Sequence, residues 1–316
     1  NRCVDDNSPL DRVRLYADGG DDADIWAGLA ELGVPALLVP EAQGGIGLNP
    51  LDAAIVAESL GAHITPSPFL GTAVMAPTAL VASGGNHDDL LAEIAAGTHR
   101  VGIAFSEAIK RRNDARVEAR DSRLFGKSLF AFDADANSYL VADQNKHLYL
   151  VAAQDPGLTR THLTTVDKTR RTVELTYDDV AAQCISTDVG VFERVLDIGR
   201  VAIAADTLGA AQNMLDQAVE YAKQREQFNR PIGSFQAVKH MCAEMAAQLE
   251  PCRSMVWFAG HALAELPEEA RVTACHTKAH LAEVAQFVAK TATEVHGGMG
   301  FTDLVGLHYW FKRCGA

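Results

Sequence analysis

The residues best suited to chemistry form a short run, REQF, from Arg225 to Phe228, which is followed by a Pro-Ile-Gly turn. An arginine offers a planar fork of donors that matches a pyrophosphate, and a phenylalanine offers an apolar wall for a ring system. The pair Gly297-Gly298 comes later in the chain, and glycine lets backbone amides approach a phosphate or an adenosine closely. Together, these residue types are suited to binding a cofactor that carries both a phosphate and a ring.

The same residues also have an ordinary structural interpretation. Arg225 would end a helix favourably at its dipole, and Phe228 would be a core residue. From these two residues alone the structural interpretation is favoured, because capping and core roles are common. Because the REQF run and the Gly297-Gly298 pair occur together in one chain at this separation, we favour the cofactor-binding interpretation instead.

Two further pairs have helical spacing. Asp197 and Arg200 are three residues apart and share a helix face, so an intrahelical ion pair and a ligand contact are equally good interpretations. His276 and His280 are four apart and could clamp a metal, but the H-E-x-x-H pattern is absent and no third ligand is evident. We therefore predict no metal site. The sequence also lacks a G-x-S-x-G elbow and a P-loop, which argues against nucleophilic hydrolysis and nucleoside-triphosphate chemistry.

The composition is that of a globular, acidic protein. Its 316 residues are 48% hydrophobic, enough for a complete core, and carry a formal net charge of −13. That charge argues against nucleic acid or an anionic membrane as partner, because both attract basic surfaces. Two basic islands are exceptions, Lys110 to Arg112 and Lys168 to Arg171. We expect both to be solvated loops, with a landing site for phosphate as the alternative.

The sequence predicts a cytoplasmic protein. No apolar run approaches the ~18 residues that a membrane span needs, and the first residues do not have the pattern of a signal peptide. The six cysteines are scattered, without metal-ligand spacing, which suits reduced thiols in a reducing compartment.

The elements that must position the candidate residues are mainly helical. A helix is expected after the acidic cluster Asp21 to Asp24, with Ile25, Trp26, Leu29 and Leu32 on one face, and it should end at Gly33. The glycines between Gln43 and Gly47 lack the strand and acidic partner of a dinucleotide fingerprint, so we interpret them as a turn. Further helices are predicted over 50–61, up to 82, and over 88–96.

The middle and the end of the chain differ in periodicity. Short runs rich in Val, Leu, Tyr, Phe and Thr predict a small β domain, a sandwich or barrel. These expected strands cover 101–105, 128–132, 139–142, 147–152 and 172–177. Long helices with apolar residues every three or four positions then predict a bundle. We expect them over 191–224, 234–266 and 267–296, with a final segment after Thr302.

Three stretches resemble the acyl-CoA dehydrogenase family. They are LDIGRVAIAADTLGAAQNMLDQAVEYAKQREQFNRPIGSFQ (196–236), EVHGGMGFTDLVGLHYWFK (294–312) and the run from Gly33 to Leu80. The resemblance covers most of the chain and implies an α+β, mainly α fold. Its implied parts are an N-terminal helical domain (1–99), a central small β-barrel or sandwich (100–188) and a C-terminal four-helix bundle (189–316).

The resemblance also implies FAD shared at a subunit interface. In this family one subunit supplies the β domain and the catalytic glutamate, and its neighbour supplies an RxxF turn and a QxxGG turn. The cofactor-binding residues implied here are Arg225, Gln227, Phe228, Gln236, Glu294, Gly297 and Gly298. Glu294 replaces the family's glutamine, and an ionised carboxylate cannot donate a hydrogen bond and repels phosphate. Asp197 and Arg200 match a D-x-x-R pattern that contacts the acyl-CoA substrate.

The family's catalytic base has no match in the sequence. One family location is Gly199 here, and the other, in a Y-E-G-T stretch, would fall after Ala316. The T-E-P and G-S-D features that serve a chain's own flavin are replaced by Phe105-Ser106-Glu107-Ala108 and a basic loop. An aromatic-Ile-Thr strand is replaced by Phe130-Ala131-Phe132.

Residues that serve a neighbour's flavin are therefore kept, and those for this chain's own flavin are not. We expect the non-catalytic subunit of a heteromeric (α2β2) acyl-CoA dehydrogenase, inactive alone, with a second dehydrogenase subunit and an electron-transfer acceptor as partners. The implied context is lipid metabolism, and by analogy steroid degradation. Two alternatives stay open: a homomeric FAD enzyme whose base lies beyond Ala316, and a flavin-free structural or CoA-binding module.

Overall fold

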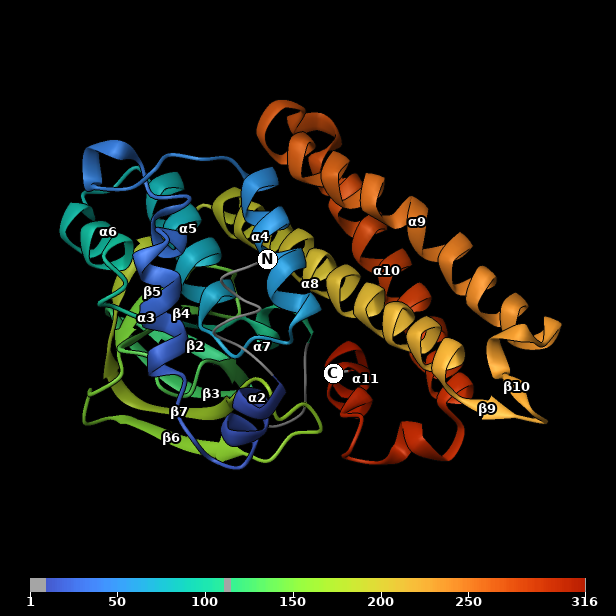
Figure 1. The fold of residues 1–316 in the computed structure, drawn as a ribbon. Coiled ribbons are helices and arrows are strands. Elements are labelled where there is room, and N and C mark those ends of the chain that lie inside the picture. The colour runs from blue at the N-terminus through green and yellow to red at the C-terminus, as the bar shows by residue number, and fades with distance from the viewer. Residues whose placement is uncertain (1–9, 111–114, 316) are drawn as a thin grey trace.

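The computed structural model describes residues 10–110 and 115–315, arranged as a helical part, a central sheet and a long helical bundle (Figure 1). The first part is helical as far as Ala95. Its elements are α2 (Leu10–Ala17), α3 (Ala23–Glu31), η1 (Val34–Ala36), η2 (Glu41–Gln43), α4 (Pro50–Ala62), the π-helix η3 (Phe69–Met75), α5 (Ala76–Ala82) and α6 (Asp88–Ala95).

Local signals explain where the early helices begin and end. The Asn49 side chain accepts the backbone N–H groups of Leu51 and Asp52, and the Asp52 carboxylate accepts the Asn49 N–H, so a capping box starts α4. In α3 the predicted apolar face is buried except at Leu32, which is 56% exposed. Leu32 is the C-cap residue, one position beyond the helix end at Glu31, and it keeps αR backbone angles, so the predicted face is buried only within the helix itself.

The glycine-rich segment before α4 is a turn, as predicted. Gly44 and Gly47 have φ values of +81° and +68°, which L side chains rarely adopt. Gly45 packs so closely on Val39 that a Cβ would lie 1.9 Å from the Val39 carbonyl oxygen. The glycines thus serve chain reversal.

The central part is one eight-stranded sheet. Its strands are β1 (Val101–Ala104), β2 (Val117–Arg120), β3 (Arg123–Phe132), β4 (Ser138–Ala142), β5 (Leu148–Ala152), β6 (Leu158–Leu163), β7 (Thr172–Ala181) and β8 (Gln183–Ser186), with the short α7 (Ser106–Ile109) after β1. The order is β6-β7-β3-β1-β4-β5-β8, and β2 pairs with β3. The β1–β4 pair is parallel and the others are antiparallel.

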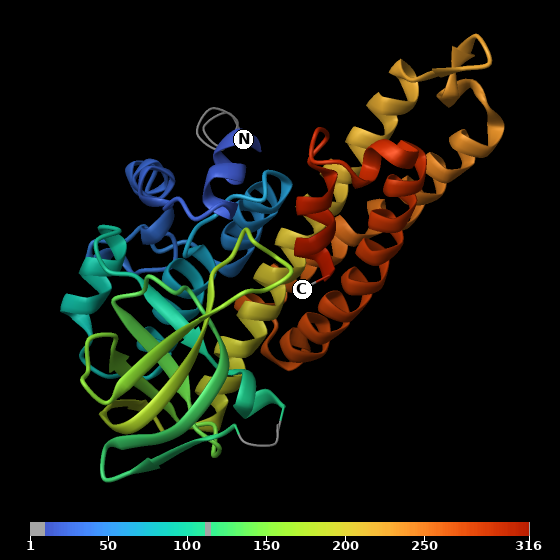
Figure 2. The same cartoon turned by 90° about the horizontal axis from the view of Figure 1, so that it is seen from below.

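Both faces of this sheet are covered. All five residues of β4 are buried. Because successive side chains point to opposite faces, Leu140 and Ala142 join a core shared with the helices, whereas Tyr139 and Val141 join a second core with Leu175 of β7. The sheet curls around this second core (Figure 2), which gives the predicted β domain its barrel-like shape.

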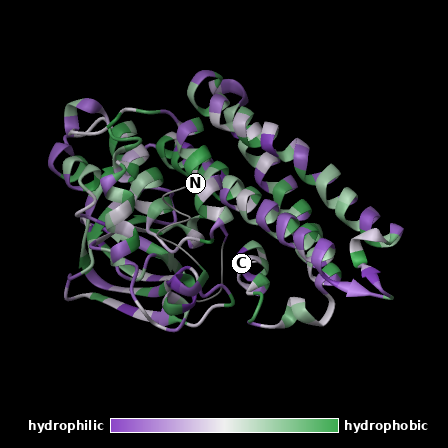
Figure 3. Ribbon diagram, viewed as in Figure 1, coloured by the Kyte–Doolittle hydropathy of each residue, from purple (hydrophilic) through white to green (hydrophobic). Residues whose placement is uncertain are grey.

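The last part is the bundle. It contains α8 (Val189–Gln224), α9 (Gln236–Glu265), α10 (Pro267–His296) and the short α11 (Leu307–Gly315), with the hairpin β9 (Glu226–Gln227) and β10 (Arg230–Pro231), η4 (Ile232–Ser234) and η5 (Gly297–Phe301). The three long helices match the predicted ranges within about two residues at each end. The hairpin projects from the end of the bundle (Figure 1) and is hydrophilic (Figure 3).

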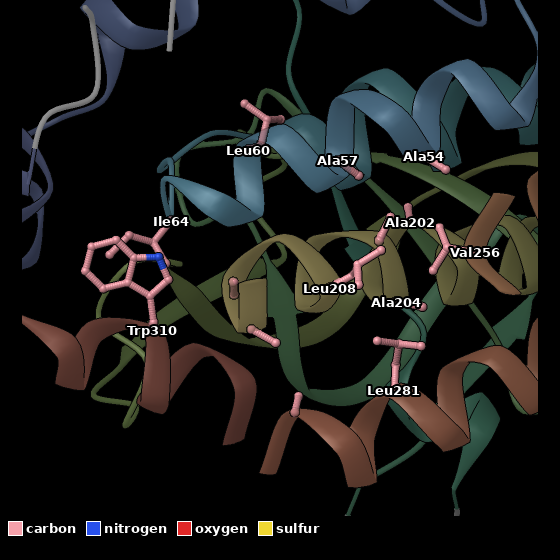
Figure 4. Packing of buried hydrophobic residues seen from close by; sticks show 14 of the residues in the cluster. Ala54, Ala57, Leu60, Ile64, Ala202, Ala204, Leu208, Val256, Leu281 and Trp310 are labelled. Atoms are coloured by element: carbon pink, nitrogen blue, oxygen red, sulfur yellow. The ribbon is translucent and has the colours of Figure 1, made fainter. Parts of the chain in front are cut away.

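Small residues bring α4 and α8 into close contact. A Cβ on Gly61 would lie 1.9 Å from the Asp206 carbonyl oxygen, and one on Gly209 would lie 1.8 Å from that of Glu58. The surrounding core joins α4 and α8 to α9 and α10 (Figure 4). None of the described helices combines the length and the hydropathy that a membrane span requires.

Candidate functional site

The two candidate binding turns lie at the same end of the bundle. Arg225 follows the last residue of α8, and its N–H donates to the Tyr221 carbonyl at 2.8 Å. Gly297 follows the last residue of α10. The Tyr221 and His296 rings stack with centroids 4.6 Å apart and planes inclined by 27°, so the two helix ends are in direct contact. The structure therefore brings together two blocks that are far apart in the sequence.

The candidate side chains at this end point away from the fold. Phe228 is 87% exposed and sits at the tip of the β9–β10 hairpin with a φ of +54°. Arg225 is exposed and makes no side-chain hydrogen bond or ion pair with another described residue, while the Gln227 amide donates to the Glu226 carbonyl at 2.8 Å. A phenylalanine so exposed is not a core residue, which excludes one of the two structural interpretations of this run.

The glycine turn is equally open. Gly297 has a φ of +57°, and a Cβ on either Gly297 or Gly298 would meet nothing within 4 Å. The missing side chains are therefore not required by packing within this chain. Glu294 is exposed one turn earlier, and Gln236 is the exposed first residue of α9.

Asp197 and Arg200 form an ion pair within α8. Asp197 is only 5% exposed, and burial raises the pKa of its carboxyl group although the Arg200 guanidinium opposes that shift. The α8 helix has 36 residues, so about 40 Å separates this pair from Arg225. The structure does not bring these two sets of candidates together within one chain.

Gly199 lies between Asp197 and Arg200 on α8 and packs against the π-helix η3. A Cβ at Gly199 would lie 3.0 Å from the Met75 sulfur and 3.1 Å from its methyl carbon. Met75 is itself 4% exposed, and η3 is fixed to β1 because the Thr72 hydroxyl accepts the Val101 N–H at 2.9 Å. Position 199 thus has no room for a larger side chain unless Met75 moves.

Family models for the acyl-CoA dehydrogenase N-terminal domain and C-terminal domain match residues 8–98 and 189–315. The acyl-CoA dehydrogenase IpdE2 of Mycobacterium tuberculosis is 31% identical over 309 residues, which are 96% of this chain and 83% of the relative. This chain belongs to the acyl-CoA dehydrogenase family. Members of this family are oxidoreductases that act on CH–CH bonds and generally bind FAD.

Two solved structures resemble this acyl-CoA dehydrogenase over nearly its whole length. A variant of the Tcur3481-Tcur3483 steroid ACAD has a TM-score of 0.89 at 28% identity and covers 99% of this chain and 89% of its own. The ChsE4-ChsE5 complex from Mycobacterium tuberculosis has a TM-score of 0.89 at 26% identity and covers 99% and 88%.

Residues 105–132, which depart from the family's T-E-P and aromatic-Ile-Thr patterns, are tied together by hydrogen bonds within the chain. The Ser106 hydroxyl lies 3.2 Å from the Phe130 carbonyl and 3.1 Å from the Glu107 carboxylate, to which it donates within the chain. The Glu107 carboxylate in turn accepts the Leu129 N–H at 2.9 Å. Asp133, directly after β3, has its pKa raised to about 6 by burial. Glu107 thus holds α7 to β3 as a structural residue.

The basic islands are only partly solvated. Lys168 is exposed, as expected, but Arg170 pairs with Asp206 and Arg171 pairs with Asp135. The solvated-loop prediction was wrong for these two arginines because carboxylates on α8 and after β3 face them. In the other island, Arg111 and Arg112 lie outside the described residues.

Sequence reasoning missed a buried ion pair that anchors α11. Arg313 of α11 donates twice to Asp206 of α8, at 2.6 and 3.1 Å, and to the Thr169 hydroxyl at 3.0 Å. Burial alone would raise the pKa of Asp206, but Arg170 and Arg313 lower it. Met75 and Tyr221 were missed as well, because nothing in their local sequence shows which distant residue they touch. Arg313 lies beside Lys312 near the end of α11, so its local sequence does not distinguish it from a solvated basic residue.

Proposed function

We propose that this chain is the non-catalytic subunit of a heteromeric acyl-CoA dehydrogenase that dehydrogenates an acyl-CoA thioester between its α and β carbons. It would lend Arg225, Gln227, Phe228 and the glycine turn to FAD held by a catalytic partner. The observation that carries this proposal is the outward exposure of both turns at the far end of α8 from Gly199. We propose three domains for the chain: an N-terminal helical domain (1–99), a central β domain (100–188) and a C-terminal bundle (189–316).

The distance along α8 supports a shared cofactor site. A flavin seated against this chain's own β sheet would lie near Gly199, about 40 Å from Arg225. The REQF hairpin would therefore serve a flavin that another subunit holds. The 87% exposure of Phe228 supports the same inference, because a large apolar side chain on a projecting hairpin is suited to burial by a partner.

The residues at these turns fit FAD. The Arg225 guanidinium is free to donate to a pyrophosphate, and the open space beside Gly297 and Gly298 leaves their backbone accessible to an adenosine or phosphate group. FAD, when bound, supplies the acceptor for the substrate's β hydride. Glu294 is the exception. Because its carboxylate repels phosphate, we propose no direct phosphate contact for it.

The closed position 199 supports a non-catalytic role for this chain. An acid there would have to displace Met75 and become buried beside it. In the proposed complex the base would come from the partner, while Asp197 and Arg200 would support the acyl-CoA region. The steroid ACAD among the similar structures motivates a steroid side-chain CoA ester as the substrate class. We place this complex in the cytoplasm as an α2β2 assembly. An electron-transfer acceptor would reoxidise its reduced FAD.

The first test compares the purified chain with the chain co-expressed with a dehydrogenase encoded beside it. Visible flavin absorbance and mass in solution are measured for both. We expect a colourless chain alone and a larger, yellow complex. A yellow homo-oligomer with dehydrogenase activity would refute the proposal in favour of a homomeric enzyme.

Arg225→Ala then tests the interface role within the complex. We expect it to release FAD, whereas Arg230→Ala should keep FAD. Arg230 lies in the same hairpin, but its guanidinium stacks on Phe235 at 4.0 Å. Equal FAD retention by both variants would favour a flavin-free structural or CoA-binding role for this chain.

A further inference from the structure

The two candidate turns follow different helices, the hairpin after α8 and the Gly297-Gly298 turn after α10. The hairpin is fixed at its base, where the Ile232 N–H donates to the Arg225 carbonyl at 2.7 Å. The Gly297-Gly298 turn, by contrast, is exposed and open. For both turns to grip one cofactor, the ends of α8 and α10 must keep a fixed separation.

The Tyr221–His296 ring pair is a direct contact between these two helix ends. Tyr221 is the residue whose carbonyl accepts the Arg225 N–H, and His296 directly precedes Gly297. Their stacked rings therefore connect the last turn of α8 to the last turn of α10, next to both candidate segments.

The His296 ring is held in one orientation. It is 3% exposed, and its Nδ1 lies 2.8 Å from the Ala292 carbonyl. A carbonyl oxygen can only accept, so Nδ1 carries the proton and the neutral ring is fixed as that tautomer. Burial also lowers the pKa of His296, which favours this neutral form.

We propose that the Tyr221–His296 stack is a positioning element that sets the spacing of the Arg225–Phe228 and Gly297–Gly298 turns, and thereby the affinity of the complex for FAD. The inference rests on the proposed function, because it assumes that both turns contact one FAD. Neither ring is assigned a contact with FAD itself. The pair acts through the turns that it joins, as supporting residues around a binding site do.

The test uses the co-purified complex and titrates the FAD-depleted form with FAD. His296→Ala and Tyr221→Ala remove the stack and should raise the dissociation constant for FAD about tenfold or more, the scale seen when supporting residues around a site are lost. His296→Phe and Tyr221→Phe keep a ring at each position and should restore binding to within about threefold of wild type.

A control separates positioning from general loss of stability. Val288→Ala, two turns earlier in α10 at a fully buried position, should lower the melting temperature but leave the FAD dissociation constant unchanged. If His296→Ala fails to fold, Tyr221→Ala at a partly exposed position carries the test.

Three outcomes would overturn the inference: unchanged FAD affinity in both alanine variants, an equal loss in the ring-conserving variants, or an equal loss in Val288→Ala. Arg225→Ala identifies which claim has failed. If it releases FAD while His296→Ala does not, only the positioning role falls. If neither variant affects FAD, the proposed interface function falls as well.

Discussion

Placing an acid at Gly199 is the sharpest test of the claim that this chain's own base position is closed. The perturbation is Gly199→Glu, combined with Met75→Ala in a double-mutant cycle. A glutamate Cβ would lie 3.0 Å from the Met75 sulfur, closer than ordinary van der Waals contact. Met75 is 4% exposed, so its end has to give way by a few tenths of an ångström within a packed core.

The expected magnitudes follow from these contacts. Overpacking a buried site costs about 1–3 kcal/mol, and burying a carboxylate adds to that, while replacing a helical glycine returns about 1 kcal/mol. We expect Gly199→Glu to lower the free energy of unfolding by about 2–4 kcal/mol. Met75→Ala alone should cost about 2–5 kcal/mol through the cavity it leaves. In the double variant the glutamate occupies that cavity, so the combined loss should be smaller than the sum by at least about 1 kcal/mol.

Urea unfolding of the purified chain, followed by circular dichroism, measures the free energy of unfolding of wild type, both single variants and the double variant. Gly199→Gln is the matched control, because it has nearly the same volume without the charge. Burial should raise the pKa of the introduced glutamate, so its excess cost over Gln should be small near pH 4.5 and grow as the pH rises. Additivity of the two substitutions within about 0.4 kcal/mol would refute the reasoning, since it would show that Met75 and position 199 do not share space.

Four further predictions concern the packing, the site and the pH dependence of stability. Gly209→Ala should destabilise the chain by about 3 kcal/mol or more in urea unfolding, because its Cβ would lie 1.8 Å from a carbonyl oxygen of α4. Gly298→Ala should change stability by less than about 0.5 kcal/mol but weaken FAD retention by the complex; wild-type retention would remove the glycine turn from the site. Arg313→Met should cost about 3–5 kcal/mol, because it breaks a buried pair and leaves Asp206 to one remaining arginine; a loss below about 1 kcal/mol would contradict the anchoring role of α11. For His296→Phe we expect wild type to lose stability relative to the variant as the pH falls from 7.5 to 5.5, because burial lowers the folded-state pKa of His296 and keeps the ring neutral while the unfolded chain takes up a proton; parallel pH profiles would contradict this.

The sequence predicted the helices that its own periodicity and capping residues define. Pro267 and Gly297 bound α10, and both limits of that helix were predicted correctly. Helix α2 was missed because its residues lack a clear pattern, and it is held by distant partners such as Asp24, which pairs with Arg12. Strand β6 was missed because it is a mostly exposed strand at the edge of the sheet, where few side chains need to be apolar.

For the candidate site, too, the sequence indicates local patterns but not contacts between distant residues. Arg225, Phe228 and the glycine pair could be named as candidates from the sequence because each family pattern lies in contiguous residues. The stack of Tyr221 on His296 and the packing of Met75 on Gly199 join residues far apart in the chain, so no local pattern could indicate them. These tertiary contacts join the ends of α8 and α10 and place the end of Met75 against position 199.

The length of α8 has a consequence for assembly, because it separates the two groups of candidate residues. A single helix carries the pair Asp197 and Arg200 in its third and fourth turns and Arg225 just beyond its last residue, about 40 Å away. No rotation of side chains can close that distance, so the two ends must contribute to two different sites. If the chain's own base position is closed, the end that carries Arg225 is the one that can still serve a complete flavin site. That site then has to belong to a partner whose own equivalent of position 199 is open, or which carries its base elsewhere.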